Sequence, residues 1–143
     1  MKKLSNRGFT LIEIVIVLAI AALIMVIVFL AVQGANRAQR DTARKSTANQ
    51  ILAAVQQYAG NNSGDMPSQP SDLQSYLNPP PSDPQTGAYV VTSFSSGAAT
   101  DTNRLVLSPG TCSGNAVVSA TVRTFAVSIY QENGGAYCIS DTQ

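Results

Sequence analysis

The sequence contains no histidine, no tryptophan and only two cysteines in 143 residues. Without histidine it can build neither a Ser-His-Asp triad nor a Cys-His pair, and two cysteines are too few for a structural zinc site. The aspartate and glutamate residues form no pair at a spacing that indicates catalysis. We therefore predict no enzyme activity, no catalytic residue, no metal site and no cofactor. The net charge of +1 also disfavours a dedicated nucleic-acid binder, which is usually strongly basic.

The charges are distributed unevenly along the chain. Residues 1–8 carry a net charge of +3, residues 9–32 carry −1, residues 33–59 carry +3 and residues 60–143 carry −4. We divide the chain accordingly into a leader, an apolar segment, an amphipathic helical segment and a C-terminal head.

The segment Phe9–Val32 holds 24 residues with a single charge, Glu13, and with neither glycine nor proline. As a helix it is roughly 36 Å long at 1.5 Å per residue, enough to cross a bilayer. A cleaved secretory signal has a shorter apolar core of ~7–15 residues, so we predict a membrane-spanning helix. A carboxylate at bilayer depth is costly, and Glu13 therefore either reaches the membrane interface or pairs with a positive group.

The residues around Glu13 read Arg7-Gly8-Phe9-Thr10-Leu11-Ile12-Glu13 and precede the apolar helix. This pattern resembles the processing site of type IV prepilins and pseudopilins. The resemblance implies that a prepilin peptidase cuts after Gly8 on the cytoplasmic side and that Phe9 becomes the N-methylated first residue. It also implies that Glu13 neutralises the amino group of a neighbouring Phe9 during assembly, a use of buried charge that sets register.

Residues 33–59 are expected to continue the helix, because they lack proline and are rich in good helix formers. At 100° per residue, Ile51, Val55 and Tyr58 share one face, which we expect to pack on the head. The run of glycine and asparagine at residues 60–64 predicts the end of a single helix over residues 9–59.

Arg37, Arg40 and Arg44 lie on one stripe of this helix, in line with Ile51, Val55 and Tyr58. Three hypotheses are open for the stripe. It is solvated or near lipid head groups, it pairs with acidic heads of neighbouring subunits, or it contacts DNA along a filament.

The head, residues 60–143, is rich in uncharged polar residues and begins with a proline-rich stretch. We predict a short helix over Ser71–Leu77, a turn over Asp83–Gly87, and strands over Ala88–Phe94, Arg104–Leu107, Asn115–Tyr130 and Ala136–Ser140. The run Asn115–Tyr130 changes phase, which suggests two strands or a bulge. The predicted fold is α+β, a meander of three or four antiparallel strands packed on a long N-terminal helix, as in type IV pilins.

Cys112 and Cys138 are the only thiols, and they lie in a head that we place outside the cytoplasm. Exposed thiols oxidise there, so we predict a disulfide between them.

The resemblance implies a major subunit of a type IV pilus, used for adhesion, motility or DNA uptake. Its partners would be copies of itself in a helical filament, a prepilin peptidase and N-methyltransferase, an inner-membrane assembly platform, and membrane lipid before assembly; nucleic acid is a weaker candidate. The expected location is the cytoplasmic membrane, with the N-terminus in the cytoplasm, and then the cell surface. One alternative is a pseudopilin of a type II secretion or competence system. Another is an uncleaved, membrane-anchored binding domain.

Overall fold

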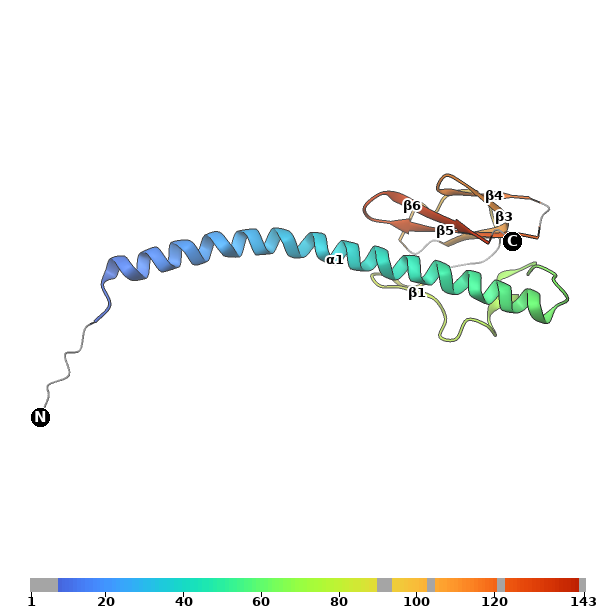
Figure 1. The fold of residues 1–143 in the computed structure, drawn as a ribbon, viewed down its shortest axis with the longest axis horizontal. Coiled ribbons are helices and arrows are strands. Elements are labelled where there is room, and N and C mark those ends of the chain that lie inside the picture. Colours follow the sequence, from blue (N-terminus) through green and yellow to red (C-terminus); the bar gives the residue numbers. More distant parts are fainter. Residues whose placement is uncertain (1–7, 90–93, 103–104, 121–122, 142–143) are drawn as a thin grey trace, which may run out of the picture. The chain divides into compact units, whose positions relative to one another are not determined.

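The computed structural model describes residues 8–89, 94–102, 105–120 and 123–141. It divides into two compact units, Met1–Asn36 and Arg37–Gln143. One helix, α1 (Leu11–Asn61), contributes to both units. The expected α+β class, a long N-terminal helix with a small antiparallel sheet, is confirmed (Figure 1). The observed helix begins and ends two residues later than predicted.

The first unit is helical from Leu11 onward, and its described residues form no tertiary core. Every described residue from Gly8 to Gln39 is exposed, including the large apolar side chains of the segment Phe9–Val32. By length and composition α1 can cross a membrane. The segment can be helical without tertiary contacts because its backbone N–H and C=O groups form hydrogen bonds to one another within the helix.

The main sheet of the second unit has four antiparallel strands. They are β3 (Leu105–Ser113), β4 (Ala116–Ser119), β5 (Phe125–Gln131) and β6 (Gly135–Ser140). Their order is β4-β3-β5-β6, so the expected meander is wrong in one respect: β5 pairs with β3 rather than with β4. The run Asn115–Tyr130 does divide into two strands, and residues 131–135 turn β5 back into β6.

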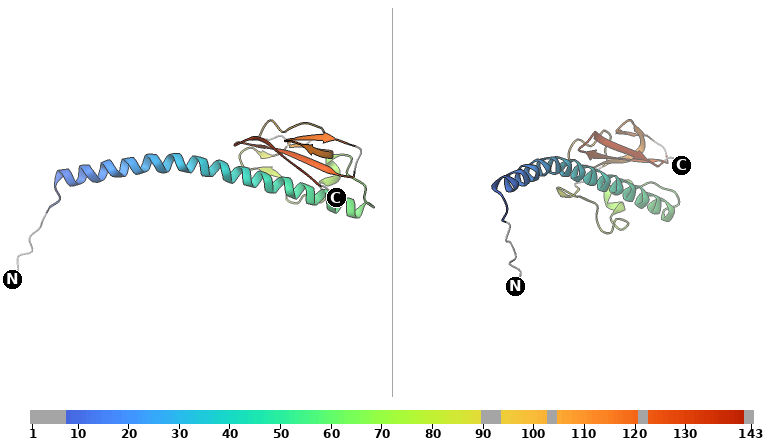
Figure 2. Two further views of the ribbon diagram at one scale, coloured as in Figure 1. Left: turned by 45° about the horizontal axis from the view of Figure 1, so that its top comes forward. Right: turned by 60° about the vertical axis from the view of Figure 1, so that its left-hand side comes forward.

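The inner face of the sheet packs on the second half of α1. Alternate strand residues such as Leu107, Phe125 and Val127 join Ile51 and Val55 in the larger hydrophobic core. This cluster confirms that the helix face predicted from the 3.6-residue period is buried. Figure 1 and both views of Figure 2 show the sheet on one side of this part of α1.

The outer face of the sheet has a smaller core of its own. Val106 and Ala126 lie there against Val117 of β4 and Ala99 of the preceding loop. Beyond Pro109, β3 leaves β5 and pairs only with β4, so that the β3–β4 hairpin folds over the sheet. The sulfur atoms of Cys112 and Cys138, on the non-adjacent strands β3 and β6, are 1.99 Å apart in a disulfide that ties this hairpin down.

The proline-rich stretch contains less regular structure than expected. The predicted helix over Ser71–Leu77 is a single 3-10 turn, η1 (Pro70–Leu73), because proline-rich flanks leave no room for more. The turn Asp83–Gly87 is confirmed and joins two short strands, β1 (Ser82–Asp83) and β2 (Gly87–Ala88). The predicted strand Ala88–Phe94 pairs only at Ala88, and its residues 90–93 lie outside the described part, as does Arg104 of the next predicted strand.

Candidate functional site

The N-terminal end of α1 presents the candidate processing residues and the one acidic side chain of the apolar segment. Phe9 is 86% exposed, and Gly8 precedes it in non-helical, open backbone. Thr10 donates two hydrogen bonds to Oε2 of Glu13, from its backbone N–H (2.8 Å) and from its hydroxyl (2.6 Å). Glu13 thus caps the helix start on the exposed segment, in the pattern of a capping box.

The second unit, Arg37–Gln143, is called the head from here on, because the second half of α1 packs with residues 60–143. It contains a second group of charged residues, which the sequence did not predict as a group. It consists of Arg40, Asp41, Arg44, Asp83 and Glu132, and we call it the charge cluster. Its members come from α1, from the β1–β2 turn and from the β5–β6 turn. Ion pairs therefore connect α1 to segments that lie about 40 and 90 residues further along the sequence.

Arg44 is the centre of the charge cluster and its side chain is completely buried. Its Nε donates to Oδ2 of Asp83 at 2.6 Å. Its Nη1 donates to Asp41 at 3.2 Å and to Glu132 at 3.1 Å. The guanidinium carbon also lies 5.6 Å from the ring centroid of Tyr130. A buried guanidinium is tolerated only with such partners, and here three carboxylates supply them.

Glu132 and Asp41 hold the β5–β6 turn on the helix. Arg40 donates to both oxygens of Glu132, each at 2.6 Å, in a bidentate pair. Asp41 accepts the backbone N–H groups of Glu132 and Asn133, at 2.9 and 3.2 Å. All the polar contacts of this turn with α1 therefore use either an ion pair or a charged acceptor, which are the stronger kinds of hydrogen bond.

These contacts shift the pKa values of Glu132, Asp83 and Arg44. The hydrogen bonds from Arg40 lower the pKa of Glu132 to about 2; burial opposes this effect and Arg44 adds to it. Burial alone would raise the pKa of Asp83, but hydrogen bonds from Arg44 and from the N–H groups of Gln85 and Thr86 outweigh it and lower the pKa. Burial would likewise lower the pKa of Arg44, yet Asp83 and Glu132 raise it above the ordinary value. All these side chains are therefore charged at neutral pH.

The structure places the three arginines of the predicted basic stripe in different surroundings. Arg44 is wholly buried and paired with Asp41, Asp83 and Glu132. Arg40 is occupied by Glu132, and of the three only Arg37 is exposed and outside the charge cluster. The angular count already placed Arg44 in line with Ile51 and Val55, a signal that this position faces the head.

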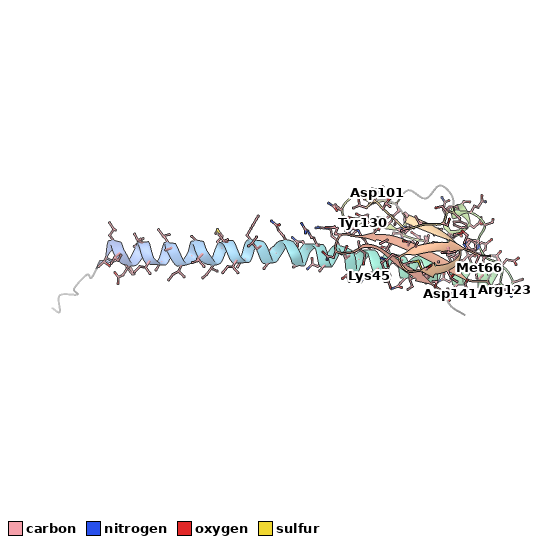
Figure 3. All side chains as sticks on the ribbon, turned by 90° about the horizontal axis from the view of Figure 1, so that it is seen from above. Lys45, Met66, Asp101, Arg123, Tyr130 and Asp141 are labelled. Atoms are coloured by element: carbon pink, nitrogen blue, oxygen red, sulfur yellow. A yellow bond between two sulfur atoms is a disulfide. The ribbon has the colours of Figure 1, made fainter. Side chains whose placement is uncertain are left out.

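Charged residues outside the charge cluster lie at both ends of the sheet (Figure 3). Lys45 and Tyr130 lie at one end of the sheet, whereas Arg123 and Asp141 lie at the other beside Met66. These last three line a shallow cleft of about 320 Å³ with the end of α1. Among the residues that the structure describes, no three His, Cys, Asp or Glu side chains are grouped so as to hold a metal ion.

Comparison with known proteins gives one match. Residues 3–29 match the model of the prokaryotic N-terminal methylation motif, which includes the proposed cleavage site and most of the apolar segment. No curated protein and no solved structure matches the chain. This motif is typical of structural subunits with an apolar N-terminal helix, and the α+β architecture described above is consistent with it. Within residues 3–29 the chain therefore carries the prepilin-type signature.

Proposed function

We propose that the protein is the major structural subunit of a type IV pilus. A prepilin peptidase removes residues 1–8, Phe9 is methylated on its new amino group, and the apolar segment Phe9–Val32 holds the subunit in the membrane until it enters the filament. The single observation that carries this proposal is the 27-residue prepilin-type match, whose described apolar side chains from Phe9 onward are all exposed in the structure.

The physical chemistry of the segment supports polymerisation. A helix that is apolar on every side needs either lipid or other helices around it. Copies of the same segment, packed together after leaving the membrane, provide such surroundings. Glu13 is the only charge among them, and an ammonium group on Phe9 of a neighbouring copy is the partner that would balance it.

The head supports an extracytoplasmic location. Its disulfide joins the only two cysteines, a bond that persists in oxidising surroundings. We therefore propose that the N-terminus lies in the cytoplasm and the head outside it. The other proposed partners are the assembly platform, the peptidase and, before assembly, lipid. Within the predicted basic stripe, Arg37 is exposed, and we propose that it contacts lipid or another subunit.

The experiment is electron microscopy of filaments sheared from the cells, with mass spectrometry of their subunit. We expect filaments whose main protein begins with an N-methylated Phe9 and contains the disulfide between Cys112 and Cys138. Filaments without this protein would contradict the proposal. A subunit that begins at Met1 and remains in the membrane fraction would instead indicate an uncleaved anchored domain.

The second candidate is a pseudopilin of a type II secretion or competence system, favoured by the same N-terminal motif. Deleting the gene for the protein separates the two. Loss of long surface filaments with normal secretion supports the pilus, whereas loss of secreted proteins or of transformation without visible filaments supports a pseudopilus.

A further inference from the structure

The contact between α1 and the sheet is of two chemically different kinds. Between Ala48 and Val55 it is apolar and belongs to the larger core. Between Arg40 and Arg44 it consists of the ion pairs and charged hydrogen bonds of the charge cluster. Apolar contacts are largely indifferent to which apolar residue they meet, whereas ion pairs require particular partners.

The apolar pattern that the sheet uses on α1 is not unique in this helix. Ala48, Ile51, Leu52 and Val55 have the spacing i, i+3, i+4, i+7 and are buried under the sheet. The same spacing recurs at Leu23, Val26, Ile27 and Leu30, where the residues are 59–66% exposed. Three of these four side chains are at least as large as the buried ones at the corresponding positions. If the sheet were shifted along α1 by a shorter distance toward the C-terminal end of the helix, it would meet Val55, Tyr58 and Ala59.

Hydrophobic burial alone therefore gives the sheet several acceptable positions on α1. The most apolar of them lies in Phe9–Val32, the segment that has to stay free. Something other than hydrophobicity has to select residues 48–55.

We propose that the charge cluster is a register device that directs the sheet to residues 48–55 of α1 and keeps Phe9–Val32 free of it. In any other register Asp83 and Glu132 lose Arg44 and Arg40, and each of these charges then faces an apolar partner. Leaving a partly buried charge unpaired costs far more than a difference in apolar area can recover.

The geometry of the charge cluster supports a role in selecting one position of the sheet on α1, beyond simply holding the two together. Arg44 contacts acidic residues from three separate segments at once, namely Asp41 on its own helix, Asp83 before the β1–β2 turn and Glu132 after β5. Asp41 additionally binds the backbone of the β5–β6 turn. Helix, loop and hairpin can satisfy all these groups together only in one relative position. The inference rests on contacts within the head and holds whether or not the chain polymerises.

The test measures register directly in the full chain, solubilised in detergent. Nitroxide labels are attached to unnatural ketone residues at Ala53 on α1 and Thr111 on β3, both exposed, so that the native disulfide is left intact. Double electron–electron resonance then reports the distance distribution between helix and sheet. The main variant replaces three charges by apolar residues of similar size: Arg44→Met, Asp83→Leu and Glu132→Leu.

We expect one narrow distance in the unsubstituted chain and two or more in the variant, although the variant keeps a cooperative urea transition. The matched control, Arg37→Met with Asp101→Leu, changes exposed charges outside the charge cluster and is expected to keep the single distance. A variant that retains one unchanged distance overturns the proposal.

A milder variant decides the matter if the triple variant does not fold. Arg40→Met with Glu132→Leu removes the half-exposed pair and leaves Arg44 with Asp83 and Asp41. An additional distance population in this variant supports the register device, and an unchanged single distance contradicts it.

Discussion

Arg44 is the residue on which the head most depends, because its buried guanidinium joins three separate segments. Methionine at this position has similar length but cannot neutralise Asp83, whose side chain is itself fully buried. Removing one partner of a buried ion pair typically costs about 3 to 5 kcal/mol. We expect Arg44→Met to lower the free energy of unfolding by that amount, measured by urea unfolding of the full chain with near-ultraviolet circular dichroism.

The control for this measurement is Arg37→Met, since Arg37 is exposed. An exposed substitution of this kind usually changes stability by no more than about 0.5 kcal/mol. Equal effects of the two substitutions would contradict the central role of Arg44.

Glu132 makes the stability of the head depend on acid. Its pKa is lowered from 4.5 to about 2 in the folded protein, so the unfolded chain takes up a proton first as the pH falls. The stabilisation is therefore complete above pH 4.5 and is lost as the pH falls toward 2. We expect the urea midpoint to decline in this range, and to decline less steeply in Glu132→Gln. Asp101→Asn, an exposed control, should leave the slope unchanged; an equally steep decline in Glu132→Gln would refute the assignment.

At the scale of elements, the β3–β4 hairpin can fold over the sheet because Gly110 adopts a backbone angle φ of +150°, which other residues rarely adopt. A Cβ at this position would also collide with the carbonyl oxygen of Val118. We expect Gly110→Ala to destabilise the head by about 1 to 3 kcal/mol through this strain. Gly60→Ala is the control: it lies in α1 with open space around it, and should raise stability by up to about 1 kcal/mol. A neutral Gly110→Ala would show that the hairpin bends elsewhere.

The disulfide is the covalent restraint on the same hairpin. Cys112 and Cys138 are 26 residues apart, and closing a loop of this size stabilises a fold by about 2 to 4 kcal/mol. We expect the double substitution to serine to lower the thermal midpoint of the head and to speed amide exchange in β4 more than in β5. Reduction of the unsubstituted chain should reproduce both effects. Uniform exchange across the sheet would show that the disulfide supports the whole head rather than the hairpin.

For the whole molecule, the decisive residue is Glu13, which lies far from the head in the sequence. If it pairs with Phe9 of another copy, Glu13→Gln should leave membrane insertion intact and abolish filaments, because a buried ammonium group would then have no counter-charge. Immunoblots of membrane and sheared-surface fractions would measure both. The control Asp101→Asn changes an exposed charge outside the charge cluster and should still yield filaments. Abundant filaments from Glu13→Gln would contradict the assembly role.

Much of the molecule follows from local patterns in the sequence. The exposed helix over residues 9–32 follows from an unbroken apolar run, and the buried face around Ile51 and Val55 follows from the 3.6-residue period. The β5–β6 turn was predictable from Gln131-Glu132-Asn133-Gly134-Gly135, because the chemistry of turns is local. The strand order was not predictable, because nothing local states that β5 passes β4 to pair with β3.

The sequence by itself determined the prepilin-type N-terminus, the apolar segment, the helix face and the presence of a polar, strand-rich head. These depend on residues within a few turns of one another. Only the tertiary structure decided that Arg40 and Arg44 form ion pairs with acidic residues of the head. Asp83 lies 39 residues after Arg44 in the sequence, and Glu132 lies 88 residues after it. The physical reason is that a charge is stabilised by whatever lies within a few ångströms of it, and in this head that neighbourhood exists only after helix, loop and hairpin have come together.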